Sequence, residues 1–159
     1  MFEDILGQDS VKKKLNRAIE AKKITNAYIF SGPEGVGKKM MAEDFASNLI
    51  GIDANNSPDY ILIDAKKGEN SIKIDQIRKL NTSMSLKPYS DYKIYVINNA
   101  EKMTTQAQNA LLKTLEEPSS YGIIILISKN EDSLLQTIRA RCTEVKFSPL
   151  NRNDIKKIL

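Results

Sequence analysis

The sequence predicts an α/β fold of three layers, with a five-stranded parallel sheet between two layers of helices. The first observation behind this prediction is the alternation of short apolar runs with helical patterns, which is typical of parallel strands joined by helices. The second is a glycine-rich segment, residues 32–38, that lies between the first apolar run and the helix that follows it. The length, 159 residues, fits one domain of ordinary size.

Each element is indicated by its own pattern. The predicted strands are the apolar runs 27–31, 60–64, 92–97, 123–127 and 143–147. Three of the predicted helices cover 38–50, 71–84 and 131–140. A further helix precedes the first strand and is capped by Asp9 or Ser10, and another begins at Thr105 and is stopped by Pro118. Thr105 is expected to form a capping box with Gln108.

The first predicted helix is amphipathic. Its inner face carries Val11, Leu15, Ala18 and Ile19, and its outer face carries Lys12, Lys13, Lys14 and Arg17. The simplest interpretation of this run of positive charge is a solvated surface.

Composition excludes several classes of site and of protein. The single cysteine, Cys142, rules out an internal disulfide, and the lack of histidine rules out a zinc site of the Cys/His kind as well. No apolar run approaches the roughly 18 residues of a membrane span, and the acidic N-terminus lacks the pattern of a secretory signal. We therefore expect a soluble, cytoplasmic protein with no membrane partner. The net charge of +4 permits contact with nucleic acid but does not by itself indicate it.

Residues 32–38 read G-x-x-x-x-G-K, the pattern of a phosphate-binding loop (P-loop). In such a loop, backbone N–H groups and the start of the next helix attract phosphate, and the lysine reaches the terminal phosphates. The candidate ligands for phosphate or nucleotide are therefore Gly32, Gly35, Val36, Gly37, Lys38 and Lys39. The position after the lysine normally holds Ser or Thr as a Mg²⁺ ligand, but here it is Lys39, which cannot bind a cation. The alternative is a glycine turn that only joins a strand to a helix.

The acidic half of a nucleotide site is also altered. A P-loop is normally paired with an apolar strand that ends in an Asp for the metal and a Glu for the attacking water. Here the strand 92–97 is followed by Asn98 and Asn99, and an amide cannot act as a general base. We predict no significant ATP hydrolysis, no required cofactor, and at most weak binding of ATP, ADP or phosphate. Glu101 is an acidic substitute that keeps open the alternative of an active ATPase, whereas Glu116 and Glu117 are most simply surface charges at a helix end.

Several motifs resemble those of bacterial DNA polymerase III clamp-loader subunits, over essentially the whole chain. They are ILGQ at 5–8, AYIFSGP at 27–33, KIYVI at 93–97, NALLKTLEEP at 109–118, and TIRARC at 137–142, in which Ala140 replaces the Ser of a Ser-Arg-Cys motif. The resemblance implies the N-terminal AAA+ P-loop domain of that family. Residues 1–150 are expected to form this domain, with the degenerate nucleotide site described above. Another helix, capped by Asn151 or Asn153, has nothing of its own to pack on, so 151–159 are expected to begin a helical second domain.

Within this family the chain is similar to the delta-prime kind of subunit, because it lacks the intact metal residues and the zinc module of the gamma/tau motor kind. The resemblance implies that Arg141 is an arginine finger, presented to ATP held by a neighbouring subunit. Its alternative is a surface salt bridge. The family places a phosphate sensor at Ser128, which can also be just the end of a strand. Cys142 is expected to be a small buried residue and Arg139 a surface residue.

The function that this resemblance implies is a non-hydrolysing stator in the clamp loader of the DNA polymerase III holoenzyme, a DNA-directed DNA polymerase. Its partners would be gamma/tau and delta and, indirectly, the sliding clamp and primed DNA. A phosphotransferase is a further alternative, but the sequence has no visible arginine cluster for a substrate phosphate.

Overall fold

The computed structural model of the protein describes residues 2 and 5–150. The segment 151–159, in which the sequence predicts the start of a second domain, lies outside the described residues.

The sheet has five parallel strands, as predicted. They are β1 (Ala27–Ser31), β2 (Tyr60–Ile63), β3 (Lys93–Ile97), β4 (Gly122–Ser128) and β5 (Thr143–Lys146). Their order across the sheet is β2-β3-β4-β1-β5. In the middle of the sheet Ile29 pairs with Leu126 on one side and with Glu144 on the other.

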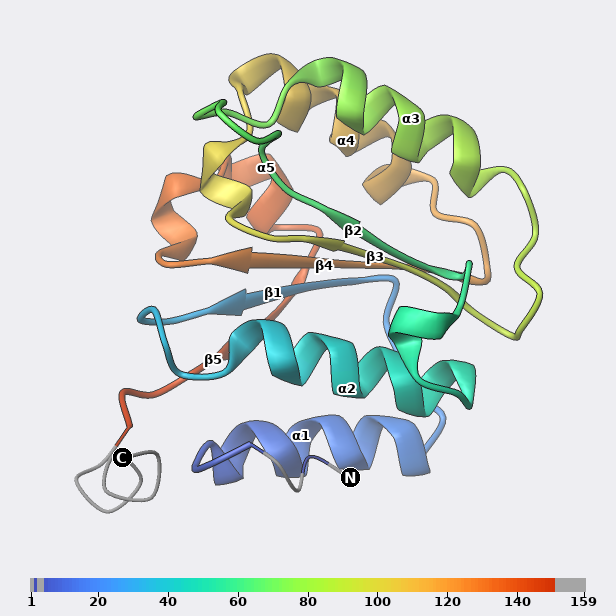
Figure 1. Ribbon diagram of the computed structural model, residues 1–159, viewed down its shortest axis with the longest axis vertical. Coiled ribbons are helices and arrows are strands. Elements are labelled where there is room, and N and C mark those ends of the chain that lie inside the picture. The colour runs from blue at the N-terminus through green and yellow to red at the C-terminus, as the bar shows by residue number, and fades with distance from the viewer. Residues whose placement is uncertain (1, 3–4, 151–159) are drawn as a thin grey trace.

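Helices cover both faces of this sheet. They are α1 (Asp9–Glu20), α2 (Lys38–Ile50), α3 (Ile74–Met84), α4 (Thr105–Glu116) and α5 (Gln136–Arg139). The shorter 3₁₀ turns are Ala54–Asn56, Ala100–Lys102 and Glu131–Ser133. Helices α1 and α2 lie on one side, and α3, α4 and α5 lie on the other (Figure 1). No helix in the described part of the chain is long and apolar enough to cross a membrane.

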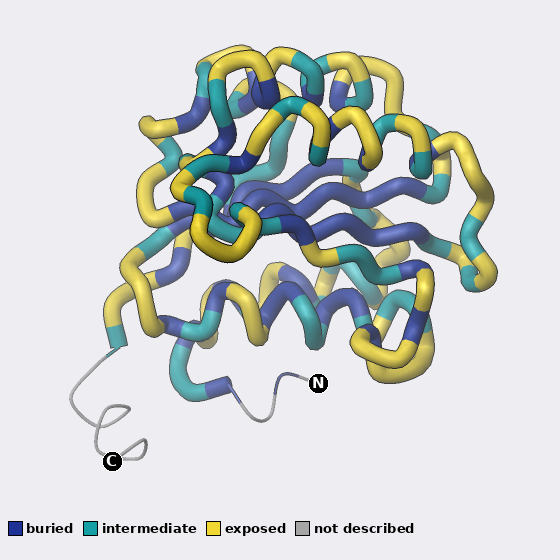
Figure 2. The backbone as a smooth tube through the Cα atoms, turned by 45° about the horizontal axis from the view of Figure 1, so that its top comes forward, coloured by how far each residue is buried: buried dark blue, intermediate teal, exposed yellow. Residues whose placement is uncertain are grey.

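Two apolar clusters form the core, one on each face of the sheet. Leu15 of α1 and Phe45 of α2 pack with Phe30 on one face, and Ile77 of α3 and Leu111 of α4 belong to the cluster on the other face. The three central strands are buried along their whole length, whereas β2 and β5 at the edges are partly exposed (Figure 2). Each fully buried aliphatic or aromatic side chain stabilises the fold by about 1.5–3 kcal/mol.

Two predicted helix caps are wrong. The residue before α1 is Gln8, in a left-handed conformation with φ 57°, and neither Asp9 nor Ser10 caps the helix because both lie inside it. The cap of α4 is Thr104, whose hydroxyl accepts a hydrogen bond from the N–H of Ala107 at 3.1 Å. Thr105 is therefore the first residue of the helix, and no capping box joins it to Gln108.

The helix predicted at 131–140 is divided in two. The N–H of Leu134 donates to the carbonyl of Glu131 in a 3₁₀ turn, and the N–H of Leu135 donates to the side chain of Gln108 on α4, at 2.9 Å. A continuous α-helix would need the Leu135 N–H for the carbonyl of Glu131. Because the Leu135 N–H donates instead to Gln108 of α4, the α-helical part begins only at Gln136.

The parallel sheet determines where a site can form. Because the strands are parallel, their C-terminal ends lie together along one side of the sheet, on the left in Figure 1. We call this side the C-terminal edge of the sheet. The segment 32–37 after β1 and the pair Asn98 and Asn99 after β3 therefore meet at that edge, where α/β sheets bind their ligands.

Candidate functional site

The segment between β1 and α2 has the backbone of a phosphate-binding loop. Gly32 has φ 146°, and a Cβ atom there would lie 2.7 Å from the carbonyl oxygen of Phe147, so only glycine fits. Gly37 is the residue before α2 and has φ 93°, which also favours glycine. Gly35 has a positive φ as well, and Val36 is buried at 5% exposure, so Val36 anchors the loop in the core.

The N-terminus of α2 is suited to an anion. No side chain caps this end of the helix, and its first turn contains Lys38 and Lys39 but no acidic residue. The positive end of a helix dipole normally favours acidic side chains nearby, so two lysines here are unfavourable unless an anion binds. The residues present therefore fit a phosphate group, held by backbone N–H groups and lysine.

Lys38 lies along the floor of this loop. Its ammonium group donates to the carbonyl of Ser128 at 3.1 Å and to the carbonyl of Gly32, and the residue is only 7% exposed. Burial lowers the pKa of Lys38, and the nearby carboxylates of Glu101 and Glu34 oppose this shift. Lys39 is exposed and is among the residues that line the same site.

The loop and the ends of β3 and β4 surround an open groove of about 460 Å³. Its polar lining includes Lys38, Lys39, Asn98, Asn99, Glu101 and Ser128. An ion pair of 2.7 Å between Glu34 and Lys129 joins two further residues of this lining, one in the loop and one after β4. Lys129 lowers the pKa of Glu34, and Glu34 raises that of Lys129.

The groove does not provide a good set of ligands for Mg²⁺. The hydroxyl position is Lys39, and the strand-end positions are Asn98 and Asn99. The carboxylates in the lining are Glu34, which is paired with Lys129, and Glu101. In the part of the chain that the structure describes, no three Asp, Glu, Cys or His side chains gather closely enough to hold a metal ion. A hard cation prefers several carboxylate or hydroxyl oxygens, so the residues fit phosphate but not the metal.

The two asparagines share a partner that the sequence did not reveal. Asn98 and Asn99 donate from their side-chain amides to the carboxylate of Asp64, at 3.1 Å and at 3.2–3.3 Å. Asp64 follows the end of β2, the strand beside β3. Its place after an apolar run was visible in the sequence, but the pairing of β2 with β3 was not.

Glu101 lies in the short turn after β3 and reaches the groove. Its Oε2 atom is buried and has no hydrogen-bond partner. Ser128, at the end of β4, uses its hydroxyl in the following turn, where it donates to the carbonyl of Asn130 at 2.8 Å.

Arg141 lies at the opposite edge of the sheet. It lies two residues before β5 and is therefore near the N-terminal ends of the strands, whereas the phosphate-binding loop is at their C-terminal ends. A strand of five residues such as β1 is about 16 Å long. The side chain of Arg141 is 48% exposed and pairs with Glu116 at 3.5 Å. It also lines a cavity of about 250 Å³ together with Thr25, Leu115 and Thr143.

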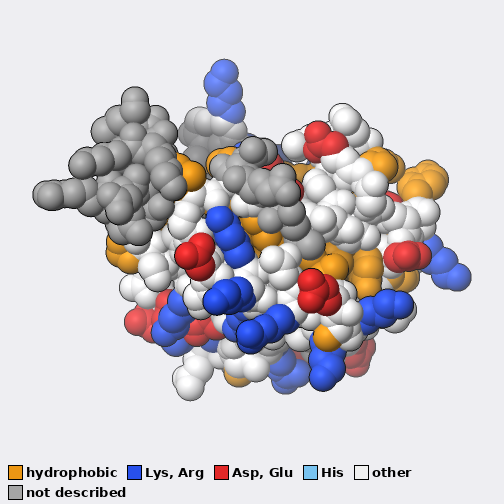
Figure 3. Space-filling model, turned by 90° about the horizontal axis from the view of Figure 1, so that it is seen from below, with side chains coloured by type: hydrophobic (Ala, Val, Ile, Leu, Met, Phe, Trp, Pro, Cys, Tyr) orange, Lys and Arg blue, Asp and Glu red, His pale blue; other side chains and the backbone are white. Residues whose placement is uncertain are grey.

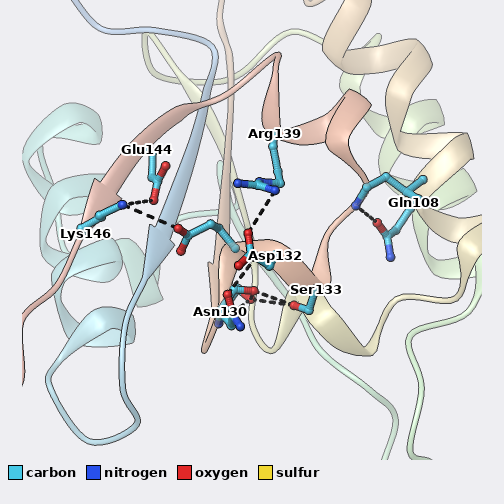
Figure 4. Close-up of polar contacts among 10 residues, drawn as sticks. Gln108, Asn130, Asp132, Ser133, Arg139, Glu144 and Lys146 are labelled. Carbon is cyan, nitrogen blue, oxygen red and sulfur yellow. Dashed lines mark hydrogen bonds and ion pairs between the residues drawn. The ribbon is translucent and has the colours of Figure 1, made fainter.

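The segment that leads to Arg141 is fixed by polar contacts (Figure 4). The side chain of Asn130 caps a 3₁₀ turn by accepting from the N–H of Asp132, and Asp132 pairs with Arg139 at 3.2 Å. Gln108, only 6% exposed, accepts from the N–H of Leu135 and so ties this segment to α4. Cys142 is partly rather than fully buried, and burial raises the pKa of its thiol to about 12, so little thiolate forms at neutral pH. Glu117 is exposed at the end of α4.

The comparisons with known proteins agree on one family. The family described as "DNA polymerase III, delta subunit" matches residues 7–151. The chain is 33% identical to the tau subunit of DNA polymerase III from Bacillus subtilis, over 97% of this chain and 30% of the relative. It is also 33% identical to the delta-prime subunit from the same organism, over 94% of this chain and 50% of the relative. The chain therefore spans half or less of the length of these relatives.

Solved structures show the same fold. A DNA polymerase III gamma subunit-related protein from Thermotoga maritima superposes with a TM-score of 0.73 at 22% identity, over 91% of this chain and 47% of that protein. The Holliday junction branch migration motor RuvB from the same organism gives 0.70 at 19% identity, over 96% of this chain and 49% of that protein. These matches confirm the predicted AAA+ P-loop fold.

Proposed function

The chain belongs to the DNA polymerase III delta-subunit family, and we propose that it is a clamp-loader subunit that does not hydrolyse ATP and instead supplies Arg141 to ATP bound by a neighbouring subunit. The relatives include both tau and delta-prime subunits at equal identity. The choice between a motor and a stator therefore depends on the residues of this chain.

The loss of hydrolysis is supported by three positions at one edge of the sheet. Lys39 replaces the metal-binding hydroxyl, and Asn98 and Asn99 replace the two acids. The loss of a general base alone typically lowers a rate by about 10²–10⁴. The loss of the metal removes further stabilisation of the charge that develops on the phosphate. Both effects act on the same step, so we expect no measurable turnover by the chain alone.

The observation that carries the proposal is the place of Arg141. This residue is half-exposed at the sheet edge opposite the phosphate-binding loop of its own chain. A guanidinium there is out of reach of its own loop but accessible to a second protein. An arginine supplied in this way to the γ-phosphate can raise a rate by about 10³–10⁵. The single cysteine of the chain further favours the delta-prime kind, because a four-cysteine zinc module cannot form.

The proposed partners follow from this role. A gamma/tau subunit would hold the ATP, and delta would complete the complex, so contact with the sliding clamp and primed DNA would be indirect. Residues 1–150 would be the AAA+ domain, and 151–159 the start of the next domain.

An active ATPase is the second candidate, and Glu101 is the observation that favours it. Its carboxylate reaches the groove, and one of its oxygens has no hydrogen-bond partner. That oxygen would be available to accept a hydrogen bond from the water that attacks the phosphate. A steady-state assay of the isolated chain with Mg²⁺ and ATP separates the two candidates. Turnover above about 0.1 per second, at the low end of enzyme rates, would rule out the stator.

The decisive experiment is Arg141→Ala in a complex reconstituted with the motor and delta subunits. We expect ATP hydrolysis by the complex to fall by at least about tenfold, a small part of the effect known for arginine fingers. Arg78→Ala is the matched control, because Arg78 also lies in an exposed ion pair but on α3, outside the segment that carries Arg141. Equal rates for the wild type and Arg141→Ala would refute the finger.

A further inference from the structure

The outer face of α1 carries a stripe of positive charge. Ser10, Lys13, Lys14 and Arg17 follow one another at helical spacing, and all four are exposed. They line a shallow hollow of about 550 Å³ on the surface of this helix. Figure 3 shows the face of the molecule on which α1 lies, with several Lys and Arg side chains close together across its middle.

The excess positive charge of the chain lies in α1 and in the short turn that follows it. Residues 9–23 contain six Lys and Arg but only two Asp and Glu, which gives a balance of +4. The net charge of the complete chain is also +4, so positive and negative charges are equal in number elsewhere. The excess is therefore concentrated in one segment: α1 has a balance of +2, and Lys22 and Lys23 in the turn after it add the other two charges.

The fold holds this stripe in place. Val11 and Leu15, on the other side of α1, are 3% and 0% exposed, so the helix cannot roll or detach easily. The ammonium group of Lys14 donates to the carbonyl of Glu144 on β5 at 2.8 Å. Among the described residues, Lys13, Lys14 and Arg17 form no ion pair with an acidic side chain. Like charges one turn apart repel each other and destabilise a helix, and a bound anion would remove this repulsion.

We propose that this stripe binds the phosphodiester backbone of a nucleic acid. From Ser10 to Arg17 the helix rises by about 10 Å, and one strand of a duplex presents a phosphate about every 3.4 Å along its axis. A strand that lies along α1 would thus place about three phosphates opposite the stripe. A membrane surface does not fit, because insertion needs an exposed apolar face and that of α1 is buried in the core.

This site goes beyond the proposed function, which depends on Arg141 and gives the chain only indirect contact with primed DNA. The stripe would add a direct contact through α1. The two are separable by experiment. Arg141→Ala should keep the affinity for nucleic acid, and a stripe variant should keep the stimulation of a partner's ATP hydrolysis measured without DNA.

The test is fluorescence anisotropy of a short labelled DNA duplex titrated with the full chain at several salt concentrations. The variant Lys13→Gln/Arg17→Gln should weaken binding about tenfold at low salt and reduce the slope of log affinity against log salt by about 2. The matched control is Lys66→Gln/Lys67→Gln, a pair of exposed lysines in a distant turn with the same change of charge. It should weaken binding by less than about twofold. Thermal unfolding of each variant checks that the fold is kept.

Three results would overturn the proposal. The first is no binding by the wild-type chain at low salt. The second is an equal loss in both double variants, because it would mean that only net charge matters. The third is stronger competition by polyglutamate than by unlabelled DNA of equal charge, because it would identify an acidic protein surface as the ligand.

Discussion

Asn99 donates from its side-chain amide to both carboxylate oxygens of Asp64, at 3.3 and 3.2 Å. It does so from a left-handed backbone conformation, φ 52° and ψ 51°, which asparagine tolerates better than most residues. The strand end where a catalytic acid would stand is therefore occupied by donors for a neighbouring acid. This arrangement makes the amides part of the folded structure.

Asn99→Asp should therefore destabilise the protein without restoring hydrolysis. The new carboxylate would stand about 3 Å from that of Asp64, where two negative charges repel each other and a hydrogen bond is lost. We expect the free energy of unfolding at pH 7 to fall by about 1–3 kcal/mol. The loss should become smaller on acidification, because a proton shared by two carboxylates removes the repulsion. Urea unfolding at pH 7 and at acidic pH measures both effects.

Asn109→Asp is the control for this substitution. Asn109 is exposed on α4, and Asn109→Asp adds the same negative charge at a position away from Asp64. An equal loss of stability in both variants, or a loss in Asn99→Asp that grows on acidification, would contradict the explanation by repulsion.

Nucleotide binding should be weak and independent of Mg²⁺. We propose that the loop holds phosphate through backbone N–H groups and Lys38, whereas the groove lacks the hydroxyl and the paired acids that hold a metal. Calorimetric titration with ATP and with ADP, each with Mg²⁺ and with EDTA, should give affinities within about threefold of each other. A gain of more than tenfold with Mg²⁺ would mean that another residue, such as Glu101, binds the metal.

The two lysines of the loop should differ in this titration. Lys38→Met removes the buried ammonium group and should abolish measurable binding of phosphate or nucleotide. Lys39→Met, at an exposed position of the same helix turn, should change the affinity by less than about threefold, as expected for a solvated charge. Similar losses in both would show that only the net positive charge of the loop attracts phosphate.

Cys142 should make stability depend on alkaline pH. Its folded pKa is raised to about 12 by burial, above the value of about 8.5 of an exposed thiol. Below about pH 8.5 the thiol is protonated in both the folded and the unfolded chain, so its ionisation does not lower the free energy of unfolding. As the pH rises toward 12, the unfolded chain loses its proton first, and stability falls by at most about 1.4 kcal/mol per pH unit.

The measurement compares wild type with Cys142→Ala between pH 8 and pH 10. The extra loss of stability at the higher pH should be present in the wild type and absent in the variant. Rapid labelling of the native thiol by a maleimide at pH 7.5 would contradict the raised pKa on which this prediction rests.

The sequence predicted most of the fold because its signals are local. The five strands are short apolar runs, and the phosphate-binding loop needs glycines at particular positions, such as Gly32. What it did not predict depends on contacts between elements that are distant in the chain. The carboxylate of Asp64 meets Asn98 and Asn99 only because β2 pairs with β3. The division of the helix at 131–140 depends on one acceptor atom of Gln108.

Gln108 fixes the segment that carries Arg141, so its replacement should loosen that segment. Its side chain accepts from the N–H of Leu135 and donates to the carbonyl of Met103 at 3.3 Å, both in a buried position. Gln108→Leu fills similar space but leaves both backbone groups without partners. We expect the free energy of unfolding to fall by about 1–3 kcal/mol, the usual cost of an unsatisfied buried polar group.

Hydrogen exchange distinguishes this role from a general loss of stability. In Gln108→Leu the amide of Leu135 should exchange faster by a larger factor than amides of the central strand β4, because the local hydrogen bond is lost in addition to global stability. Gln106→Leu, on the exposed side of the same helix, is the control and should leave Leu135 unchanged. If Arg141 acts on a partner's ATP, Gln108→Leu should also lower hydrolysis by the complex, although Gln108 is buried away from the partner. Unchanged exchange at Leu135 would mean that Gln108 does not hold the segment.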